Sequence, residues 1–300
     1  MQQLTGLDAA FLAMETHAVF GHIGSVSILD PSTSPDEVTL EKVTRLIEER
    51  LHLMPPFRRR LVTVPLGLDQ PYWIEDPGFN IEYHVREIAL PAPGDDRQLA
   101  DQAARLHARP LDRSRPLWEL YLIHGLSGGR IALYSKVHHA AIDGVSGGDI
   151  LAAILDLTPE GRTVEPPETA WKAESEPSSV GMLARSAVSL AFQPVRAARV
   201  GYTLARSLPA LASAPGRPRL PVIDRFMPGG STDLVLQPSG LRAPATPFNK
   251  AISPHRRWAF CSLSLEEVKA VKNKAGGTVN DVVMALSTGA LRRWLIDHDA

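Results

Sequence analysis

The chain has 300 residues, 44% of them hydrophobic, which is enough for one large or two smaller globular domains. Lys plus Arg (32) nearly balances Asp plus Glu (33), so the overall charge gives no reason to expect a nucleic-acid partner. Cys261 is the only cysteine, which excludes an intramolecular disulfide framework and fits a reducing compartment. We therefore expect a cytoplasmic protein, and because no apolar run is long enough to span a bilayer, any membrane contact should be peripheral.

The first half of the chain alternates strand and helix patterns. Residues 22–29, HIGSVSIL, are predicted to form a strand, and Ser34 with Glu37 resembles a capping box that opens a helix. Residues 95–108, DDRQLADQAARLHA, are typical of another helix. WELYLIHG and GRIALYSKVHHA flank the turn LSGG, so residues 118–139 should form an antiparallel pair. This alternation favours a mixed α/β layer fold.

Changes in composition divide the chain into five predicted parts. Residues 158–179 are rich in Pro, Glu, Ser and Thr, which is typical of a linker. The parts are an N-terminal domain over 1–157, this linker, a basic amphipathic helical segment over 180–213, a proline-rich crossover over 214–255, and the start of a C-terminal domain over 256–300.

The last part should contain a strand and two helices. We expect the strand over 257–263, one helix opened by Ser264, and a final helix from Thr278 or Asn280. The final helix shows no Gly or Pro stop signal, so we expect the second domain to be incomplete.

The stretch KVHHAAIDGVSGGDI contains the residues best suited to chemistry. In a regular strand His138 and His139 point to opposite faces, and no second cluster of ligands is apparent, so we predict no metal site. We expect one structural histidine, His138, and one general base, His139, because imidazole exchanges a proton near neutral pH. Asp143 should fix the following loop through an arginine or backbone donors, and Gly144 should supply a conformation that side chains obstruct.

Two other interpretations of this stretch carry less weight. An isolated histidine pair would more simply be a strand end packed on its neighbours, and only the full pattern HHxxxDG favours catalysis. Ser146 lacks the GxSxG elbow of a serine nucleophile, because Val145 precedes it.

HHAAIDG matches the HHxxxDG signature of the CoA-dependent acyltransferase superfamily, which includes chloramphenicol acetyltransferase and nonribosomal peptide condensation domains. Four further blocks match one branch in order and spacing: LTGLDAAFLAMET, PLWELYLI, TPFNKAISPHRRWAF and NDVVMALSTGALRRWL. Over nearly its whole length, the chain resembles the N-terminal two-thirds of bacterial bifunctional wax ester synthase/acyl-CoA:diacylglycerol acyltransferases.

This resemblance implies an α/β fold like that of chloramphenicol acetyltransferase, with two mixed-sheet domains. It also implies that His139 deprotonates the hydroxyl of diacylglycerol or a long-chain alcohol, which attacks acyl-CoA directly, with His138, Asp143 and Gly144 shaping the site. Acyl-CoA would be a co-substrate, and no bound cofactor is expected. The alternative is a non-catalytic lipid-binding or scaffold protein of the same fold.

Four other family motif positions are candidates for substrate binding: Pro116, Trp118, Asn280 and Asp281. For Trp118, burial as a core aromatic is an equally good interpretation. For Asn280 and Asp281, the alternative is a helix N-cap.

Between Glu176 and Asp224 the sequence has no acidic residue and no lysine, but it has six arginines. On one continuous helix, four of them would project within an arc of about 80°. These four are Arg185, Arg196, Arg199 and Arg206. Such a stripe suits peripheral contact with the inner face of a membrane or with a lipid droplet, or it is an ordinary solvated helix face.

Overall fold

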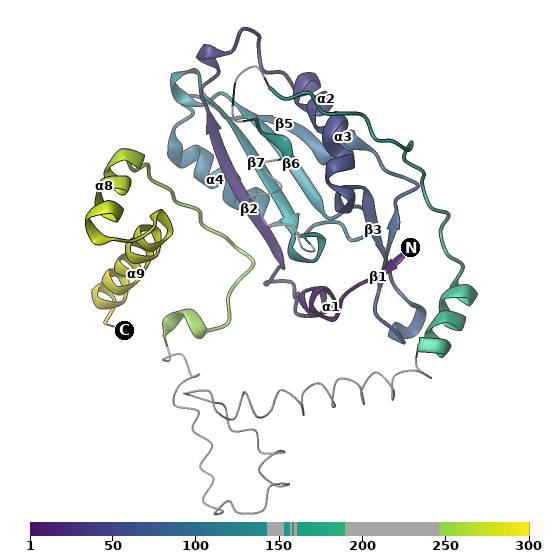
Figure 1. Ribbon diagram of the computed structural model, residues 1–300. Coiled ribbons are helices and arrows are strands. Elements are labelled where there is room, and N and C mark those ends of the chain that lie inside the picture. The colour runs from purple at the N-terminus through teal and green to yellow at the C-terminus, as the bar shows by residue number, and fades with distance from the viewer. Residues whose placement is uncertain (143–152, 157, 159–160, 190–245, 300) are drawn as a thin grey trace, which may run out of the picture. The chain divides into compact units, whose positions relative to one another are not determined.

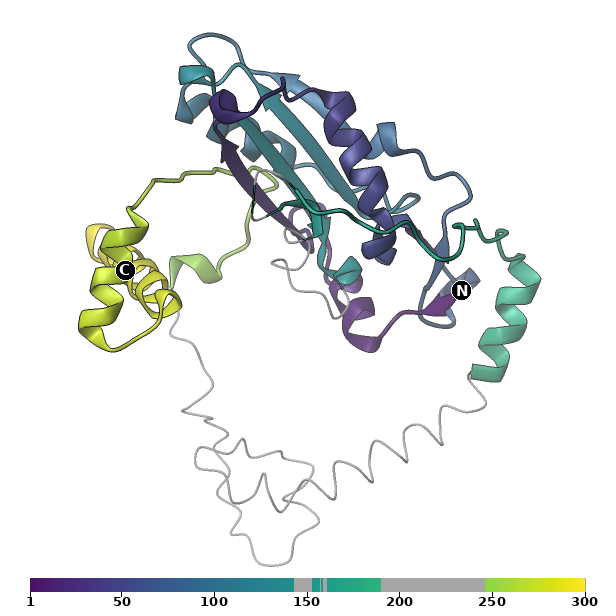
Figure 2. The same cartoon turned by 45° about the horizontal axis from the view of Figure 1, so that its top comes forward.

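The computed structural model describes residues 1–142, 153–156, 158, 161–189 and 246–299. The chain divides into two compact units. The first consists of Met1–Ala187 with Ile252–Cys261, and the second of Val188–Ala251 with Ser262–Ala300. The candidate histidines lie in the first unit, which is shown with the rest of the chain in Figures 1 and 2.

The first unit is built on a four-stranded mixed sheet with the order β2-β7-β6-β5. Neighbouring strands are antiparallel except for β5 and β6, which are parallel. The strands are β2 (His22–Leu29), β5 (Val85–Ala89), β6 (Trp118–His124) and β7 (Ile131–His138). The predicted antiparallel pair is confirmed: Gly128 and Gly129 in its turn have φ of 74° and 70°, a conformation that glycine adopts without strain.

A smaller antiparallel sheet has the order β1-β4-β3. Its strands are β1 (Gln2–Gln3), β3 (Arg59–Val62) and β4 (Tyr72–Glu75). The helices of the first unit include α1 (Gly6–Ala13), α2 (Leu40–Arg50), α3 (Ile81–His84) and α4 (Asp96–His107), and a further helix spans 179–189.

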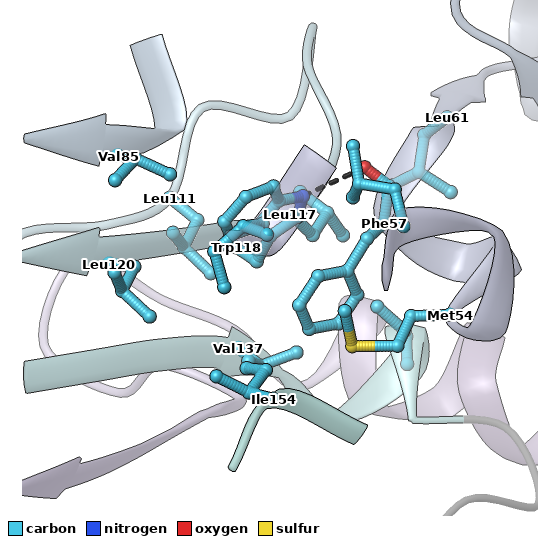
Figure 3. Packing of buried hydrophobic residues seen from close by; sticks show 14 of the residues in the cluster. Met54, Phe57, Leu61, Val85, Leu111, Leu117, Trp118, Leu120, Val137 and Ile154 are labelled. Atoms are coloured by element: carbon cyan, nitrogen blue, oxygen red, sulfur yellow. Dashed lines mark hydrogen bonds between the residues drawn. The ribbon is translucent and has the colours of Figure 1, made fainter. Parts of the chain in front are cut away.

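Side chains alternate across the main sheet, so each face has its own hydrophobic cluster. On one face, Leu99 and Leu106 of α4 pack with Tyr121 and Tyr134. On the other, Ile47 of α2 belongs to the cluster around Trp118. Figure 3 shows this second cluster, in which the Trp118 indole N–H donates to the Phe57 carbonyl at 2.8 Å. Strand β7 is therefore packed on both faces by hydrophobic side chains.

The helix starts follow local capping chemistry. For α4, a helix that the sequence predicts, Asp95 and Gln98 form a reciprocal capping box. The box predicted at Ser34 is wrong: the Ser34 hydroxyl donates to the Asp36 carbonyl instead, and α2 begins after Thr39, whose side chain accepts from the Lys42 N–H. Ser34 and Thr39 are both suited to cap this helix, and the cap is Thr39, which directly precedes the apolar repeat of α2.

The strand predicted over 257–263 is not formed. Residues 252–261 belong to the first unit, where Trp258 and Phe260 pack against the α4 cluster and Arg256 donates to the Ala18 carbonyl at 2.5 Å. This segment is held by side chains rather than by a strand ladder.

The predicted linker contains no helix or strand over 161–178, yet part of it lies on the small sheet. The Trp171 indole donates to the Glu75 carboxylate at 2.8 Å, and the Glu174 N–H donates to the Glu75 carbonyl at 3.1 Å. The helix that follows this segment carries Arg185 as an exposed residue, whereas the other three arginines of the predicted stripe lie outside the described residues.

The described part of the second unit includes the capped helices α8 (Leu265–Ala275) and α9 (Val279–Asp297). Ser264 caps α8 as predicted, and Gly276 ends it in the left-handed conformation with φ 71°. Thr278 caps α9 in a capping box with Asp281. The His298 ring stacks on Trp294 with ring centroids 4.0 Å apart, and the Phe248 ring packs against Trp294 in a tilted arrangement at 4.9 Å.

Candidate functional site at the end of strand β7

The histidine pair lies where β7 ends, as the sequence predicts. His138 is the last residue of the strand, and His139 opens the 3₁₀ turn His139–Ala141. His138 is 1% exposed, whereas His139 is an exposed residue. The two rings therefore belong to different environments, one in the core and one at the surface.

Both ring nitrogens of His138 are hydrogen-bonded. Nδ1 accepts from the Ala140 N–H at 3.0 Å, so the ring proton lies on Nε2, which donates to the Glu15 carboxylate at 3.1 Å. Burial lowers the pKa of His138, and the opposing effect of Glu15 does not reverse this shift. His138 is therefore neutral at pH 7, and its two ring nitrogens link the turn at Ala140 to Glu15.

Glu15 is the centre of this arrangement. Besides the bond to His138, its carboxylate accepts from the Gly21 N–H at 2.6 Å and from Arg113 at 2.6 Å. Arg113 also donates to the Leu12 carbonyl at 2.8 Å. Burial alone would raise the pKa of Glu15, but the hydrogen bonds from Arg113 and Gly21, together with His138, hold that pKa below its usual value. One carboxylate thus ties the end of α1 to the end of β7.

His139 is held by its backbone and by the face of its ring. Its N–H donates to the Gly21 carbonyl at 2.7 Å, and its imidazole stacks on Phe11 of α1 with ring centroids 4.0 Å apart and planes 19° apart. Within the part of the chain that the structure describes, neither ring nitrogen of His139 has a hydrogen-bond partner. The orientation of the His139 ring is therefore set by Phe11 and by the backbone of Gly21.

The surroundings of the pair favour a glycine at position 21. A Cβ there would lie 3.0 Å from Nε2 and 3.2 Å from Cε1 of His138, closer than ordinary packing allows. The backbone of the same residue bonds to both Glu15 and His139. Gly21 therefore places the loop before β2 directly against the two histidines.

Of the other predicted site residues, two lie outside the described residues, two are buried in the first unit, and two belong to the second unit. Asp143 and Gly144, and likewise Ser146, lie outside the described residues. Pro116 is buried, and Trp118 is 2% exposed, with its ring stacked on Phe57 and on His84. The geometry of Trp118 favours its interpretation as a core aromatic.

Asn280 and Asp281 lie in the first turn of α9, in the second unit. The Asp281 carboxylate accepts from the N–H and the hydroxyl of Thr278, and these hydrogen bonds lower its pKa. The cap thus includes Asp281, as the alternative interpretation proposed, but the capping residue itself is Thr278.

Sequence reasoning missed the residues that hold the pair: Phe11, Glu15, Gly21 and Arg113. Three of them are in or near the block LTGLDAAFLAMET, which carried part of the family resemblance, but nothing local links Glu15 to a histidine 123 positions later. The one local sign of a special role for Glu15 is its position just after the apolar helix α1.

The described residues show neither a metal-binding cluster nor a membrane-spanning helix. No three His, Cys, Asp or Glu side chains gather there as a metal ion would require. None of the described helices is both long enough and apolar enough to cross a membrane.

A mixed α/β unit with HHxxxDG at the end of a central strand is the arrangement expected of a CoA-dependent acyltransferase. Residues 4–283 match the model of the wax ester synthase/diacylglycerol acyltransferase catalytic domain. The chain therefore belongs to this family, and the expected family and fold class are both confirmed.

Two relatives and one solved structure illustrate the match. A putative diacylglycerol O-acyltransferase of Mycobacterium tuberculosis H37Rv is 36% identical over 98% of this chain and 59% of its own length. A probable diacylglycerol O-acyltransferase of the same strain is 33% identical over 98% of this chain and 60% of its own. The wax ester synthase/diacylglycerol acyltransferase from Marinobacter aquaeolei VT8 has a TM-score of 0.63 and 29% identity, covering 100% of this chain and 62% of that one. The chain thus spans about three fifths of the length of these proteins.

Proposed function

We propose that the protein transfers an acyl group from acyl-CoA to the hydroxyl of diacylglycerol or a long-chain alcohol, with His139 as general base. The observation that carries this proposal is the oriented, exposed imidazole at the end of β7, whose nitrogens no described residue occupies. The names of the relatives and of the solved structure support the substrate classes.

The proposed reaction is a direct transfer. An unprotonated nitrogen of His139 accepts the proton of the acceptor hydroxyl as its oxygen attacks the thioester carbon. The carbonyl electrons move to oxygen and form a tetrahedral oxyanion. When this intermediate collapses, the carbon–sulfur bond breaks, and the CoA thiolate leaves and takes the proton from the imidazolium. The products are an ester and CoA, and neither an acyl-enzyme nor a bound cofactor is needed.

The proposal also includes Asp143 and Gly144, which lie outside the described residues. Asp143 would fix the loop after the histidines by pairing with an arginine or with backbone donors, and Gly144 would allow the backbone to turn there. His138 would have a positioning role, which agrees with both of its nitrogens being bonded.

The test is release of free CoA thiol from palmitoyl-CoA by the purified protein, with diolein or hexadecanol as acceptor. We expect release that depends on the acceptor, with triacylglycerol or wax ester as the product. His139→Ala is the matched inactive control. Binding of these lipids without acceptor-dependent thiol release would contradict the proposal and favour the non-catalytic lipid-binding alternative.

Peripheral contact with a lipid surface is part of the same proposal, and it rests on the arginine pattern. Each arginine near anionic lipid contributes on the order of 1 kcal/mol, and salt weakens this attraction. Changing Arg185, Arg196, Arg199 and Arg206 together to Gln should reduce sedimentation with phosphatidylserine-containing liposomes at low salt. If the variant and the wild type sediment equally, the arginines do not bind the lipid surface and form an ordinary solvated helix face.

A further inference from the structure

Helix α1 carries an apolar stripe on its outer surface. Leu7 is 68% exposed and Met14, the C-cap residue, is 60% exposed, while Ala10 is exposed and Phe11 half-buried. Leu7 is three residues before Ala10 and four before Phe11, and Met14 is four residues after Ala10 and three after Phe11, so these side chains lie on one side of the helix. We call Leu7, Ala10, Phe11 and Met14 the α1 stripe.

The α1 stripe is uncharged and held in place from the opposite side. The one charged residue of the helix, Asp8, is buried and accepts from the Thr5 hydroxyl at 2.5 Å. Leu12 packs into the core, and its carbonyl accepts from Arg113. Eight helical residues give a preformed apolar surface roughly 12 Å long.

This surface ends at the candidate base, because Phe11 of the α1 stripe stacks on the His139 ring at 4.0 Å. A general base must lie within hydrogen-bond distance of the hydroxyl whose proton it removes. The carbons attached to that hydroxyl therefore begin beside the imidazole and Phe11. The acyl chain of the donor, in contrast, begins on the far side of the attacking oxygen.

Resting on the proposed function, we propose that the α1 stripe binds the alkyl chain of the acceptor and so sets the preference for long-chain over short-chain hydroxyl substrates. An unbranched hydrocarbon matches an uncharged surface of leucine, alanine, phenylalanine and methionine, and its burial there is favourable in proportion to the apolar area covered. The stripe is a specificity determinant, whereas His139 performs the proton transfer.

The double variant Leu7→Gln/Met14→Gln tests this assignment. Glutamine has nearly the length of methionine and is a good helix former, and both positions are exposed, so the fold should be retained. With palmitoyl-CoA as donor, we expect kcat/KM for hexadecanol to fall about tenfold relative to wild type, the effect of losing contact with roughly two methylene groups. The kcat/KM for butanol should not change.

A matched control is Leu53→Gln, since Leu53 is 46% exposed and lies in the turn after α2. This variant should keep the preference of the wild type for hexadecanol. If the double variant also keeps that preference, the proposal is wrong. An equal loss with both alcohols would overturn it as well, because it would mean that α1 acts by positioning His139.

A second experiment tests whether the α1 stripe binds the alkyl chain of the acceptor or the acyl chain of the donor. With butanol as acceptor, the ratio of the rates with palmitoyl-CoA and butyryl-CoA should be the same in the double variant and in wild type. A loss confined to palmitoyl-CoA would assign the stripe to the acyl chain and overturn the acceptor assignment.

Binding of a long-chain alcohol can be measured without turnover, so it tests the α1 stripe independently of acyl transfer. A fluorescent long-chain alcohol should bind the double variant about tenfold more weakly than it binds wild type or Leu53→Gln. If the wild type shows no acceptor-dependent release of CoA but binds this probe through the stripe, the proposed function fails while the surface assignment stands. Equal binding by all three proteins overturns the surface assignment.

Discussion

The last residue of β7 and the first residue of the turn after it carry the same side chain in opposite environments. His138 is buried and neutral, with both nitrogens bonded to groups of the protein. His139 is exposed, stacked on Phe11, and without a partner for its nitrogens among the described residues. Adjacent positions in the sequence thus place one imidazole in the core and the other at the surface.

The difference follows from where the strand ends. Strand geometry turns the His138 side chain toward the α4 side, together with Lys136 and Tyr134, while the 3₁₀ turn directs the next residue outward. A rigid, fully bonded histidine then defines the position of an exposed one. Preorganisation of this kind is what a general base requires, because small displacements of the base cost rate.

The largest effect on acyl transfer is expected from the removal of the exposed histidine. We expect His139→Ala to lower acyl transfer by about 10²- to 10⁴-fold, the usual contribution of a general base. Its unfolding free energy should change little, because the ring is exposed. CoA release and urea unfolding measure the two effects.

His138→Ala is the matched variant one residue earlier. It should lower stability by about 2–3 kcal/mol, because the buried Ala140 N–H loses its acceptor and Glu15 loses a donor. Loss of activity in His138→Ala at wild-type stability, with His139→Ala still active, would reverse the assigned roles.

Acid should reveal how much the fold depends on neutral buried histidines. Burial lowers the pKa of His22 and of His84 to about 4, and lowers that of His138. His84 donates from Nδ1 to the Trp118 carbonyl at 2.8 Å, and its Nε2 is buried with no partner among the described residues. Because each of these pKa values lies below 6.5, the unfolded chain binds more protons between pH 6.5 and 4.

The resulting stability is therefore fully present above pH 6.5 and is lost as the pH falls toward 4. His84 alone should account for about 3 kcal/mol of this loss. Urea unfolding at pH 7, 5.5 and 4.5 measures the effect, and His84→Gln should remove about one proton from the slope. Unfolding midpoints that stay constant from pH 7 to 4.5 would show that these histidines are not held neutral.

Much of this architecture could be predicted because it depends on local chemistry. The alternation in β6 and β7, with two glycines in the turn between them, placed the histidine pair at a strand end. Ser264 marked the start of α8. Each of these signals lies within a few residues of the element it determines.

The support of the site could not be predicted because its contacts are distant in sequence. Glu15 and His138 are 123 residues apart, and Arg113 is 98 residues from Glu15. The error at 257–263 has the same origin, because whether an apolar segment joins a ladder or packs by its side chains depends on which neighbours the fold supplies. Periodicity identifies an apolar face but not its partner.

Glu15→Gln changes the carboxylate that holds His138 and leaves both histidines in place. The amide has one acceptor oxygen for the Gly21, Arg113 and His138 donors, so its NH₂ group must face at least one of them. We expect the unfolding free energy to fall by about 2 kcal/mol at pH 7. Exposed Glu49, on α2, offers the control Glu49→Gln, which should stay within about 0.5 kcal/mol of wild type. A Glu15→Gln protein as stable as this control would mean that the three hydrogen bonds do not hold the turn.

Gly21→Ala tests the contact between the loop and the histidines with a single methyl group. The new Cβ would lie 3.0 Å from Nε2 of His138, a ring that Glu15 and Ala140 hold from both sides, so the loop must move by a few tenths of an ångström. We expect a loss of about 1 kcal/mol in stability and a several-fold fall in turnover, because the Gly21 carbonyl also holds the His139 N–H. In Gly6→Ala the nearest atom to the added Cβ is 3.8 Å away, and alanine favours the helix, so this variant should be as stable as wild type or more so. If both glycine variants behave alike in urea unfolding and in CoA release, then His138 has room to shift, and the buried histidine is not the rigid support on which the position of His139 depends.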